Sequence, residues 1–307
     1  MTANDIKVSI ITPVFNVENY IEQCAVSLFE QTYHNIEFIF VNDASTDGSL
    51  ATLYRVASRY NHRNIKISTN DKNSGSSATR NAGIKQATGQ YITFCDSDDW
   101  MEPSAVEEMV NTAISQDADV VVTPFFTNTF HTEKTLRFTG PHISDLNSIP
   151  ISFQYFSLWN KLIRSTFLRS HGISFLPGID CWEDLSVIAR IYALNPKVAL
   201  LDRPFYHYRK YEYHSLTSHS HERQLADRLK NTEYLIQWFE QHNLHHKYEK
   251  FLLHLKFMSK IKMLRTKPRQ YRCWKSTYPE SNHHIMQYTD IPLHYRIAFF
   301  IANIIIR

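Results

Sequence analysis

The chain has 307 residues, of which 43% are hydrophobic, 13% aromatic and 21% charged, and it contains only seven glycines. This composition can bury one large core or two modest ones, which excludes a short peptide, a disordered tail and a coiled-coil rod. The four cysteines lie far apart and form no C-x-x-C pair. The sequence therefore predicts neither a zinc site nor a disulfide framework and is typical of a reducing compartment.

The first 125 residues alternate between strand and helix patterns. Apolar residues repeat at i, i+4 between Tyr20 and Phe29, as one face of a helix requires. Strands that alternate with helices indicate parallel βαβ units, hence an α/β fold with a mostly parallel, doubly wound sheet. Such sheets bind ligands beyond the carboxyl ends of their strands. Runs rich in β-branched residues predict strands at 8–11, 36–41, 65–67, 91–94 and 119–122.

The rest of the chain has a weaker pattern and a change of charge. Residues 1–224 carry a balance of −5 and residues 225–307 a balance of +8. We predict a first domain over residues 1–220 and a basic, aromatic-rich helical region over residues 221–307. The expected elements are a hairpin or loop at 126–150, helical segments on both sides of Trp159-Asn160-Lys161, a helix from about Glu183 to Leu194, strands at 198–201 and 205–208, and helices from about His221 onward.

Carboxylates gather at the ends of the predicted strands. The second strand runs into Asp43 and Asp47, and the fourth runs into Asp96-Ser97-Asp98-Asp99. Helix capping is a sufficient account of Asp47. It does not explain the second cluster, because one cap needs one carboxylate and like charges repel. Oxygen ligands of this kind are those that Mg²⁺ or Mn²⁺ requires, so we predict a divalent cation there.

Four segments, in this order, resemble the family 2 glycosyltransferases: residues 8–16 (V-S-I-I-T-P-V-F-N), 41–49 (V-N-D-A-S-T-D-G-S), 73–83 (N-S-G-x-x-A-x-R-N-x-G) and 96–99 (D-S-D-D). These relatives are inverting enzymes with the GT-A fold, and the resemblance covers roughly residues 6–215. It implies a bacterial surface-polysaccharide enzyme that moves a sugar from a nucleotide-diphosphate donor, expected to be a UDP-sugar, to a glycan or polyprenyl-linked glycan. It also implies Mn²⁺ or Mg²⁺ as cofactor.

The resemblance assigns roles to individual residues. Asp43 is expected to accept a hydrogen bond from the N3–H of a uracil, since a carboxylate only accepts. Asp96 is expected to face the ribose and Asp98 to hold the metal, with Asp96 and His207 as further metal candidates. Asp99 is a second-best ligand or a cap for a helix near Pro103. The expected nucleotide and donor contacts are Pro13, Phe15, Asn16, Asp43, Asn73, Gly75, Arg80, Asp96, Asn160, Lys161 and Arg209.

The segment Trp182-Glu183-Asp184-Leu185 resembles the E-D motif of the same family. Inversion needs a base on the face opposite the departing diphosphate, and the resemblance gives that role to Asp184. Glu183 is the alternative base, or the group that orients the acceptor hydroxyl. A plainer interpretation is that both carboxylates only complement the dipole of the helix that they begin.

Several of the supporting residues have structural alternatives. Asn160-Lys161 resembles a family segment that contacts donor sugar or phosphate, but also fits an amphipathic helix with an extended lysine stem. Arg209 is expected to neutralise the leaving group. His207, like most histidines at a strand end, fits a structural role as well. Arg80 fits an exposed helix face.

Two other classes of protein were weighed against the enzyme. A catalytically inactive nucleotide-sugar binding or scaffold protein would have the same fold, but the intact Asp96, Asp98 and Asp184 argue against it. A nucleic-acid binder would use the basic tail. The positive charges of that tail are spread along helices without a recognised motif, so we expect no nucleic-acid partner.

The two ends of the chain lead to predictions about where the protein lies in the cell. The start is polar, with Asp5 where a signal peptide would be basic, and no run reaches about 18 apolar residues, so we expect a cytoplasmic protein. The apolar run over residues 297–306 fits a core helix packed on the catalytic domain, an oligomer contact, or peripheral attachment to the inner face of an anionic membrane. In the last case the headgroup contacts would be Lys256, Lys260, Lys262, Arg265, Lys267 and Arg269.

Overall fold

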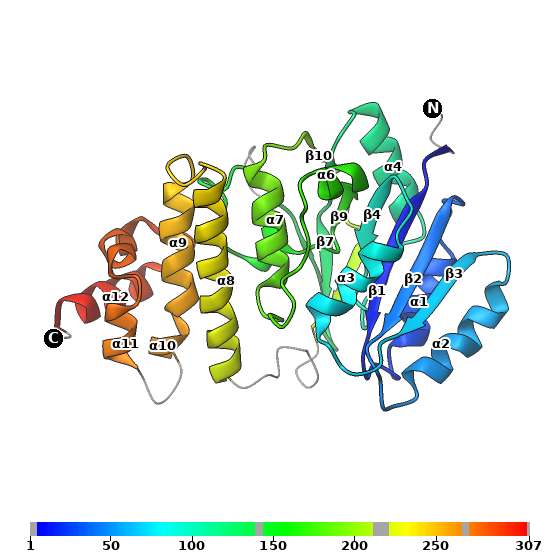
Figure 1. Ribbon diagram of the computed structural model, residues 1–307, viewed down its shortest axis with the longest axis horizontal. Coiled ribbons are helices and arrows are strands. Elements are labelled where there is room, and N and C mark those ends of the chain that lie inside the picture. The colour runs from blue at the N-terminus through cyan, green and yellow to red at the C-terminus, as the bar shows by residue number, and fades with distance from the viewer. Residues whose placement is uncertain (1–4, 139–143, 211–220, 266–269, 306–307) are drawn as a thin grey trace. The chain divides into compact units, whose positions relative to one another are not determined.

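A computed structural model describes residues 5–138, 144–210, 221–265 and 270–305 (Figure 1). The chain divides into two compact units. The first comprises Met1–Thr139, Ser157–Asp180 and Leu194–Tyr213, and the second comprises Gly140–Phe156, Cys181–Ala193 and His214–Arg307. Each unit thus contains segments that are distant in the sequence. The expected boundary at residue 220 stays a prediction.

The first unit contains a seven-stranded sheet in the order β10-β6-β9-β4-β1-β2-β3. The pairs β1–β2, β2–β3, β1–β4 and β6–β10 are parallel, whereas β9 is antiparallel to both of its neighbours. The sheet is therefore mostly parallel, which confirms the predicted α/β class. Its strands are β1 (Val8–Val14), β2 (Ile36–Asn42), β3 (Asn64–Thr69), β4 (Tyr91–Phe94), β6 (Val120–Val122), β9 (Lys161–Arg164) and β10 (Val198–Leu200).

Helices flank this sheet (Figure 1). Helix α1 buries Ile21, Cys24, Ala25, Leu28 and Phe29, which is the apolar face that its i, i+4 pattern predicts. These side chains join β1 and β2 in one core, because the strands are buried along nearly their whole length. The helices of the unit are α1 (Ile21–Phe29), α2 (Ser49–Ala57), α3 (Ser76–Gln86), α4 (Ala105–Ser115) and α6 (Ser165–Ser170), with a 3-10 turn at Ser58–Tyr60.

A smaller sheet in the first unit has the order β5-β11-β7-β8. Strands β7 and β8 form the expected hairpin, with antiparallel pairing. Strand β11 pairs parallel with β7 and antiparallel with β5, which directly follows the acidic segment that ends at Asp99. The two short strands predicted after residue 197 therefore belong to different sheets. The strands are β5 (Trp100–Met101), β7 (Phe125–Asn128), β8 (Glu133–Leu136) and β11 (Tyr206–Arg209).

The described part of the second unit is helical. Helices α8 and α9 lie side by side (Figure 1), and a cluster around Phe257, Trp274, Tyr288 and Phe299 forms a core. Its elements are α5 (Phe153–Phe156), α7 (Glu183–Ala193), α8 (His221–Gln241), α9 (Glu249–Lys260), α10 (Lys262–Arg265), α11 (Tyr271–Ser276), a 3-10 segment (Pro279–Gln287) and α12 (Leu293–Ile305).

Helix α12 differs from the buried core helix that was one expectation for the terminal run. Phe299 is its only buried residue and packs on Phe257 and Trp274 within the second unit. Its opposite face exposes large apolar side chains. They are Leu293, Ile297, Phe300, Ile301, Ile304 and Ile305. Among the described residues, no helix has the length and hydropathy of a membrane span.

The lysines expected to face lipid headgroups have other partners. Lys260 is fully buried and donates to the carbonyl oxygens of Thr277 and Tyr278. Lys256 pairs with Glu280, with 2.7 Å between Nζ and Oε1, and Lys262 donates to Gln224. Expecting a headgroup contact for Lys260 was therefore wrong, because the core of the unit satisfies its amine. Lys267 and Arg269 lie outside the described residues.

Candidate active site

The acidic turn, Asp96–Asp99, follows the buried strand β4 at the carboxyl end of the sheet. Arg80 of α3 reaches this turn, with 2.9 Å between its Nη2 and the Oδ1 of Asp96. The Arg80 side chain is only 5% exposed, and its guanidinium also lies over the ring of Phe175. Arg80 is thus a buried counter-ion of Asp96 rather than a residue on an exposed helix face.

Asp98, like Asp96, is a partly exposed carboxylate of the acidic turn. Removal from water and repulsion from Asp96 raise its pKa to about 6, against the weaker opposing effects of Arg209 and Arg80. Two carboxylates held this close favour a bound cation, because the cation relieves their mutual repulsion. Asp98 is therefore a suitable metal ligand on chemical grounds.

The acidic turn offers too few protein ligands to complete the coordination of Mg²⁺ or Mn²⁺ by itself. A bound substrate would have to supply the remaining ligands. The described residues contain no group of three or more His, Cys, Asp and Glu side chains that could hold a metal. Mg²⁺ is commonly held by one or two carboxylates together with waters and substrate phosphates, so Asp96 and Asp98 suffice as protein ligands. Their assignment as metal ligands stays a prediction.

His207 lies on β11 with its ring between Trp100 and Phe126, at centroid distances of 4.6 and 4.5 Å. Its Nε2 is 2.7 Å from Oε1 of Glu102, and its Nδ1 is 3.3 Å from Oδ1 of Asn128. Both ring nitrogens thus have partners within the smaller sheet. Among the described residues, His207 forms no metal-ligand group with Asp96 and Asp98, and its assignment as a metal ligand stays a prediction.

Arg209 lies against the acidic turn, as expected of a residue that neutralises a leaving group. Its Nε donates to the backbone carbonyl of Asp98 at 2.6 Å, and its Nη2 donates to Gln23 at 2.6 Å. The guanidinium also lies 4.8 Å from the ring centroids of both Tyr20 and Trp100. These contacts fix a positive charge beside the two candidate metal ligands.

The loops after β1 and β2 are bound to each other. Asn16, which has a positive φ of 50°, accepts a hydrogen bond from the Thr46 N–H at 2.9 Å and donates its own N–H to the hydroxyl of Ser45. Asn side chains tolerate this backbone conformation better than most. Pro13 and Phe15, just before this link, are partly exposed. These three residues remain available as predicted nucleotide contacts.

Asp43 is buried, and its carboxylate closes the loop that follows β3. It accepts from the Asn70 side chain at 2.7 Å, from the Ser74 N–H at 2.9 and 3.1 Å, and from the Gly75 N–H at 2.9 Å. This number of bonds matches the acceptor capacity of a carboxylate. The predicted uracil contact would therefore have to share an oxygen with the loop.

Gly75 begins α3 with φ 85° and ψ 165°, a region essentially reserved for glycine. The carboxylate of Asp180 lies against it and accepts from the Ser76 hydroxyl and the Ser77 N–H, each at 3.1 Å. Asp180 is not among the residues predicted from the sequence, since a lone acid far downstream of the loop carries no local signal. Asn73, by contrast, is exposed on the loop before Gly75.

Asn160 and Lys161 are buried at the start of β9. The Lys161 amine donates to the Ser157 carbonyl at 2.5 Å and to Oδ1 of Asn160 at 2.8 Å. The Asn160 amide in turn donates to the carbonyl of Thr123 at 3.1 Å. These bonds tie β9 to its neighbour, so the pair has a structural role, and its predicted donor contact stays a prediction.

Glu183 and Asp184 form the first turn of α7 in the second unit, as the E-D motif predicts. The residue before them, Trp182, has a positive φ of 66°. Its carbonyl accepts from the side chain of Asn231 at 2.6 Å, and Arg228 lies 4.6 Å from its ring centroid. Helix α8 thus holds the start of α7 in place. The assignment of Asp184 as base stays a prediction.

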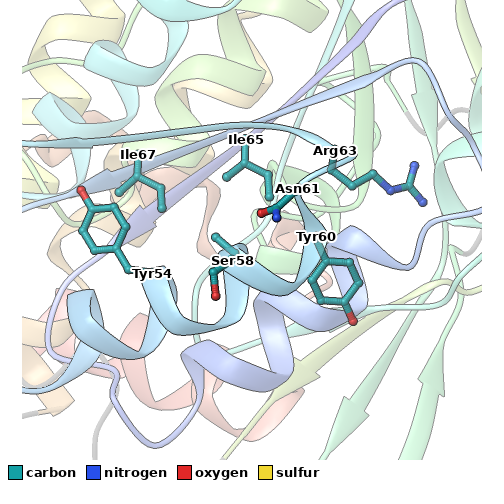
Figure 2. Close-up of a pocket in the computed structure, with 8 residues that line it drawn as sticks. Tyr54, Ser58, Tyr60, Asn61, Arg63, Ile65 and Ile67 are labelled. Atoms are coloured by element: carbon teal, nitrogen blue, oxygen red, sulfur yellow. The ribbon is translucent and has the colours of Figure 1, made fainter.

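A hollow of about 430 Å³ lies on the first unit beside the edge strand β3 (Figure 2). Tyr54, Ser58, Tyr60, Ile65 and Ile67 line it, together with neighbouring residues of α2 and β3. None of the predicted site residues is among them. The strand-end residues described above, not this hollow, are therefore the candidate active site.

The mostly parallel sheet with helices on its faces matches the GT-A fold of glycosyltransferases. A sequence profile described as "Glycosyl transferase family 2" matches residues 9–172, which is more than half of the chain. The chain belongs to this family. The predicted membership of family 2 is thereby confirmed.

Among curated relatives, the chain is 33% identical over 219 residues to glycosyltransferase GlyA of Streptococcus pneumoniae, covering 67% of this chain and 31% of GlyA. Its fold resembles that of Staphylococcus aureus TarS residues 1–349 in complex with UDP-GlcNAc, with a TM-score of 0.70, 21% identity, and coverage of 97% and 89% of the two chains. It also resembles the mannosyltransferase PcManGT from Pyrobaculum calidifontis in complex with GDP-Man and Mn²⁺, with a TM-score of 0.55, 16% identity, and coverage of 98% and 87%.

The match covers only part of the length of the curated relatives. It spans between 28% and 61% of the length of eight of them. These relatives include glycosyltransferases and a minor teichoic acid biosynthesis protein. The comparison therefore establishes the family of this chain.

Proposed function

We propose that this chain transfers a sugar, with inversion, from a UDP-linked donor to a glycan or polyprenyl-linked glycan acceptor, and that Mn²⁺ or Mg²⁺ is required. The observation that carries the proposal is the acidic turn, where Asp96 and the partly exposed Asp98 share one edge with Arg80 and Arg209. The UDP-GlcNAc complex of TarS supports a UDP donor, and the Mn²⁺ complex of PcManGT supports a metal.

In this proposal different residues of the chain have different roles in the transfer reaction. The acceptor oxygen forms a bond to the anomeric carbon while the bond from that carbon to the diphosphate oxygen breaks on the opposite face. Asp184 takes the proton from the acceptor hydroxyl, with Glu183 as orienting group or alternative base. Arg209 places its positive charge beside the departing diphosphate. A divalent cation bound by Asp96 and Asp98 would add Lewis-acid stabilisation of the same leaving group.

A binding experiment tests the donor and metal assignments. UDP and GDP are titrated calorimetrically into the wild-type chain, Asp98→Ala and Asp202→Ala, with and without Mn²⁺. Asp202 is the matched control, because it is an exposed carboxylate of the same unit, paired only at the surface with Arg137. We expect Mn²⁺-dependent UDP binding to be lost in Asp98→Ala alone. Metal-linked affinity that persists in Asp98→Ala would contradict the assignment.

Turnover tests the base and the inactive-scaffold alternative. Asp184→Asn should leave UDP affinity nearly unchanged while it lowers nucleotide release from the preferred donor by about 10²–10⁴, and Glu183→Gln should cost less. The reverse order would exchange the two roles. A wild-type chain that binds UDP yet releases no nucleotide from any donor of a UDP-, GDP- and dTDP-sugar panel would favour the scaffold protein.

We also propose that α12 attaches the second unit peripherally to an anionic membrane. The supporting observation is its exposed apolar face, formed by the six large side chains named above. A helix of 13 residues is about 20 Å long, so it is suited to lie in the interface rather than to span. Because Lys256 and Lys260 are engaged within the unit, insertion of apolar side chains should contribute more than charge.

A further inference from the structure

The acidic turn is held by a strand that is distant from it in sequence. The hydroxyl of Tyr206, on β11, accepts a hydrogen bond from the Asp96 N–H at 3.0 Å and donates to Oδ2 of Asp99 at 2.7 Å. Tyr206 and Asp99 are each only 1% exposed. A single buried hydroxyl thus bridges the first and last residues of the turn.

Asp99 uses its second oxygen on the same strand. Its Oδ1 accepts from the backbone N–H of Arg209 at 2.7 Å. Helix α4 begins at Ala105 after Ser104, so Asp99 is not the cap of that helix. The expectation that Asp99 is a second-best metal ligand or a cap is replaced by a different role, since both oxygens of the carboxylate face β11.

Strand β11 also contacts the turn through its backbone and through Arg209. The Nε of Arg209 donates to the Asp98 carbonyl at 2.6 Å, and β11 pairs with the strand that follows the turn, with Tyr206 opposite Met101. The turn is therefore fixed at three points, at Asp96, Asp98 and Asp99, by residues of one strand. The Asp96 carboxylate pairs with Arg80 of α3 and not with β11.

We propose that Tyr206 and Asp99 are positioning residues that set the geometry of the Asp96 and Asp98 carboxylates for the metal-bound diphosphate. This inference deepens the proposed function and rests on it. Groups that orient metal ligands without touching the metal typically change metal affinity or activity by about 10–100-fold when they are removed. Tyr206→Phe removes only the bridging hydroxyl, so a loss of that size is expected in Mn²⁺-dependent UDP affinity.

Tyr91→Phe is the matched control. Tyr91 is a buried tyrosine of the same unit, and its hydroxyl donates to the carbonyl of Ala118 at 2.9 Å, with no bond to the turn. Both substitutions delete a buried, hydrogen-bonded hydroxyl. Tyr91→Phe should lower the free energy of unfolding by about 1 kcal/mol, and Tyr206→Phe by about 1.5–3 kcal/mol because its hydroxyl donates to a carboxylate. Only Tyr206→Phe should weaken the Mn²⁺-dependent binding of UDP.

The experiment compares the full-length wild type and both variants in three measurements. Calorimetry gives UDP affinity with Mn²⁺, electron paramagnetic resonance gives the affinity for Mn²⁺ alone, and urea unfolding gives stability. We expect a 10–100-fold weaker Mn²⁺-dependent UDP affinity for Tyr206→Phe and a change below twofold for Tyr91→Phe. Equal losses in the two variants, or unchanged affinity in Tyr206→Phe, would overturn the proposal.

Hydrogen–deuterium exchange separates this inference from the proposed function. The Asp96 N–H should exchange faster in Tyr206→Phe than in the wild type, and Asp99→Asn should have the same effect, in the absence of any ligand. Unchanged exchange in both variants would refute the positioning role. A wild type that binds neither nucleotide while its Asp96 amide responds in this way would refute the proposed function and leave the positioning of the turn intact.

Discussion

Replacement of Gly75 by alanine tests the contact between Asp180 and the loop that joins β3 to α3. A Cβ at Gly75 would lie 2.3 Å from Oδ2 and 2.7 Å from Oδ1 of Asp180, well inside normal contact distances. The backbone of Gly75 also has a φ of 85° that side chains rarely adopt. The substitution therefore combines backbone strain with a steric clash at the N-terminus of α3.

The expected loss in free energy of unfolding follows from the backbone strain and the steric clash. An L residue in this backbone region costs about 1–3 kcal/mol. Overpacking against a fixed neighbour costs about 1–3 kcal/mol more. The lower entropy of the unfolded alanine chain offsets about 0.4–1 kcal/mol of this. Gly75→Ala should therefore lower the free energy of unfolding by about 1–5.5 kcal/mol.

The chain offers a control for the backbone effect alone. Gly178 has a similar φ of 78°, and a Cβ there would meet nothing within 4 Å. Gly178→Ala should therefore cost only about 1 kcal/mol in urea unfolding. Asp180→Ala in the Gly75→Ala background should recover part of the loss by removing the clashing oxygens. A Gly75→Ala chain as stable as Gly178→Ala, or no recovery in the double variant, would refute this reasoning.

Two further predictions concern the second unit. Burial lowers the pKa of Lys260 from 10.5 to about 7. Between these pH values the unfolded chain binds more protons than the folded chain, so the free energy of unfolding should rise with pH, by up to about 1.4 kcal/mol per pH unit. Urea unfolding at pH 7 and 9 should show this rise in the wild type and not in Lys260→Met; equal slopes would contradict it. For α12, the double variant Ile301→Asp, Ile304→Asp should no longer float with anionic liposomes. Flotation that persists in this variant, or that fails in the wild type, would exclude membrane attachment through this helix.

The sequence predicted those parts of the fold that depend on local periodicity. Runs of β-branched residues marked β1, β2, β3, β4 and β6, and the i, i+4 pattern marked the buried face of α1. The E-D motif marked the start of α7. These features are visible because each is encoded within one short segment, where alternate or every fourth residue must be apolar.

Strand β9 shows why other features were missed. It runs from Lys161 to Arg164, and a charged residue at each end is typical of an exposed segment rather than of a strand inside a sheet. It is nevertheless placed between β4 and β6, and Lys161 is fully buried. The amine is tolerated there because Ser157 and Asn160 accept its hydrogen bonds. That compensation is tertiary, so no local pattern predicts it.

The candidate site shows the same division between motif and environment. The D-S-D-D motif located the acidic turn. The motif alone did not reveal which of its three carboxylates face a ligand. Asp99 uses both oxygens on β11 and Asp96 is balanced by Arg80, while the pKa values of both Asp98 and Asp99 are raised by burial and by the neighbouring acids. The partners of these acids come from positions 80, 206 and 209, and sequence reasoning identified only the two arginines.

The different surroundings of the three acids have a common physical basis. Three carboxylates on one turn repel one another, and the fold reduces that repulsion differently at each position. Arg80 offers a full positive charge to Asp96, while Tyr206 and the Arg209 N–H offer only hydrogen-bond donors to Asp99. Asp98 is partly exposed and its pKa is raised, so its charge would gain from an external cation. A metal requirement in this protein would therefore follow from the way its own residues neutralise the other two acids.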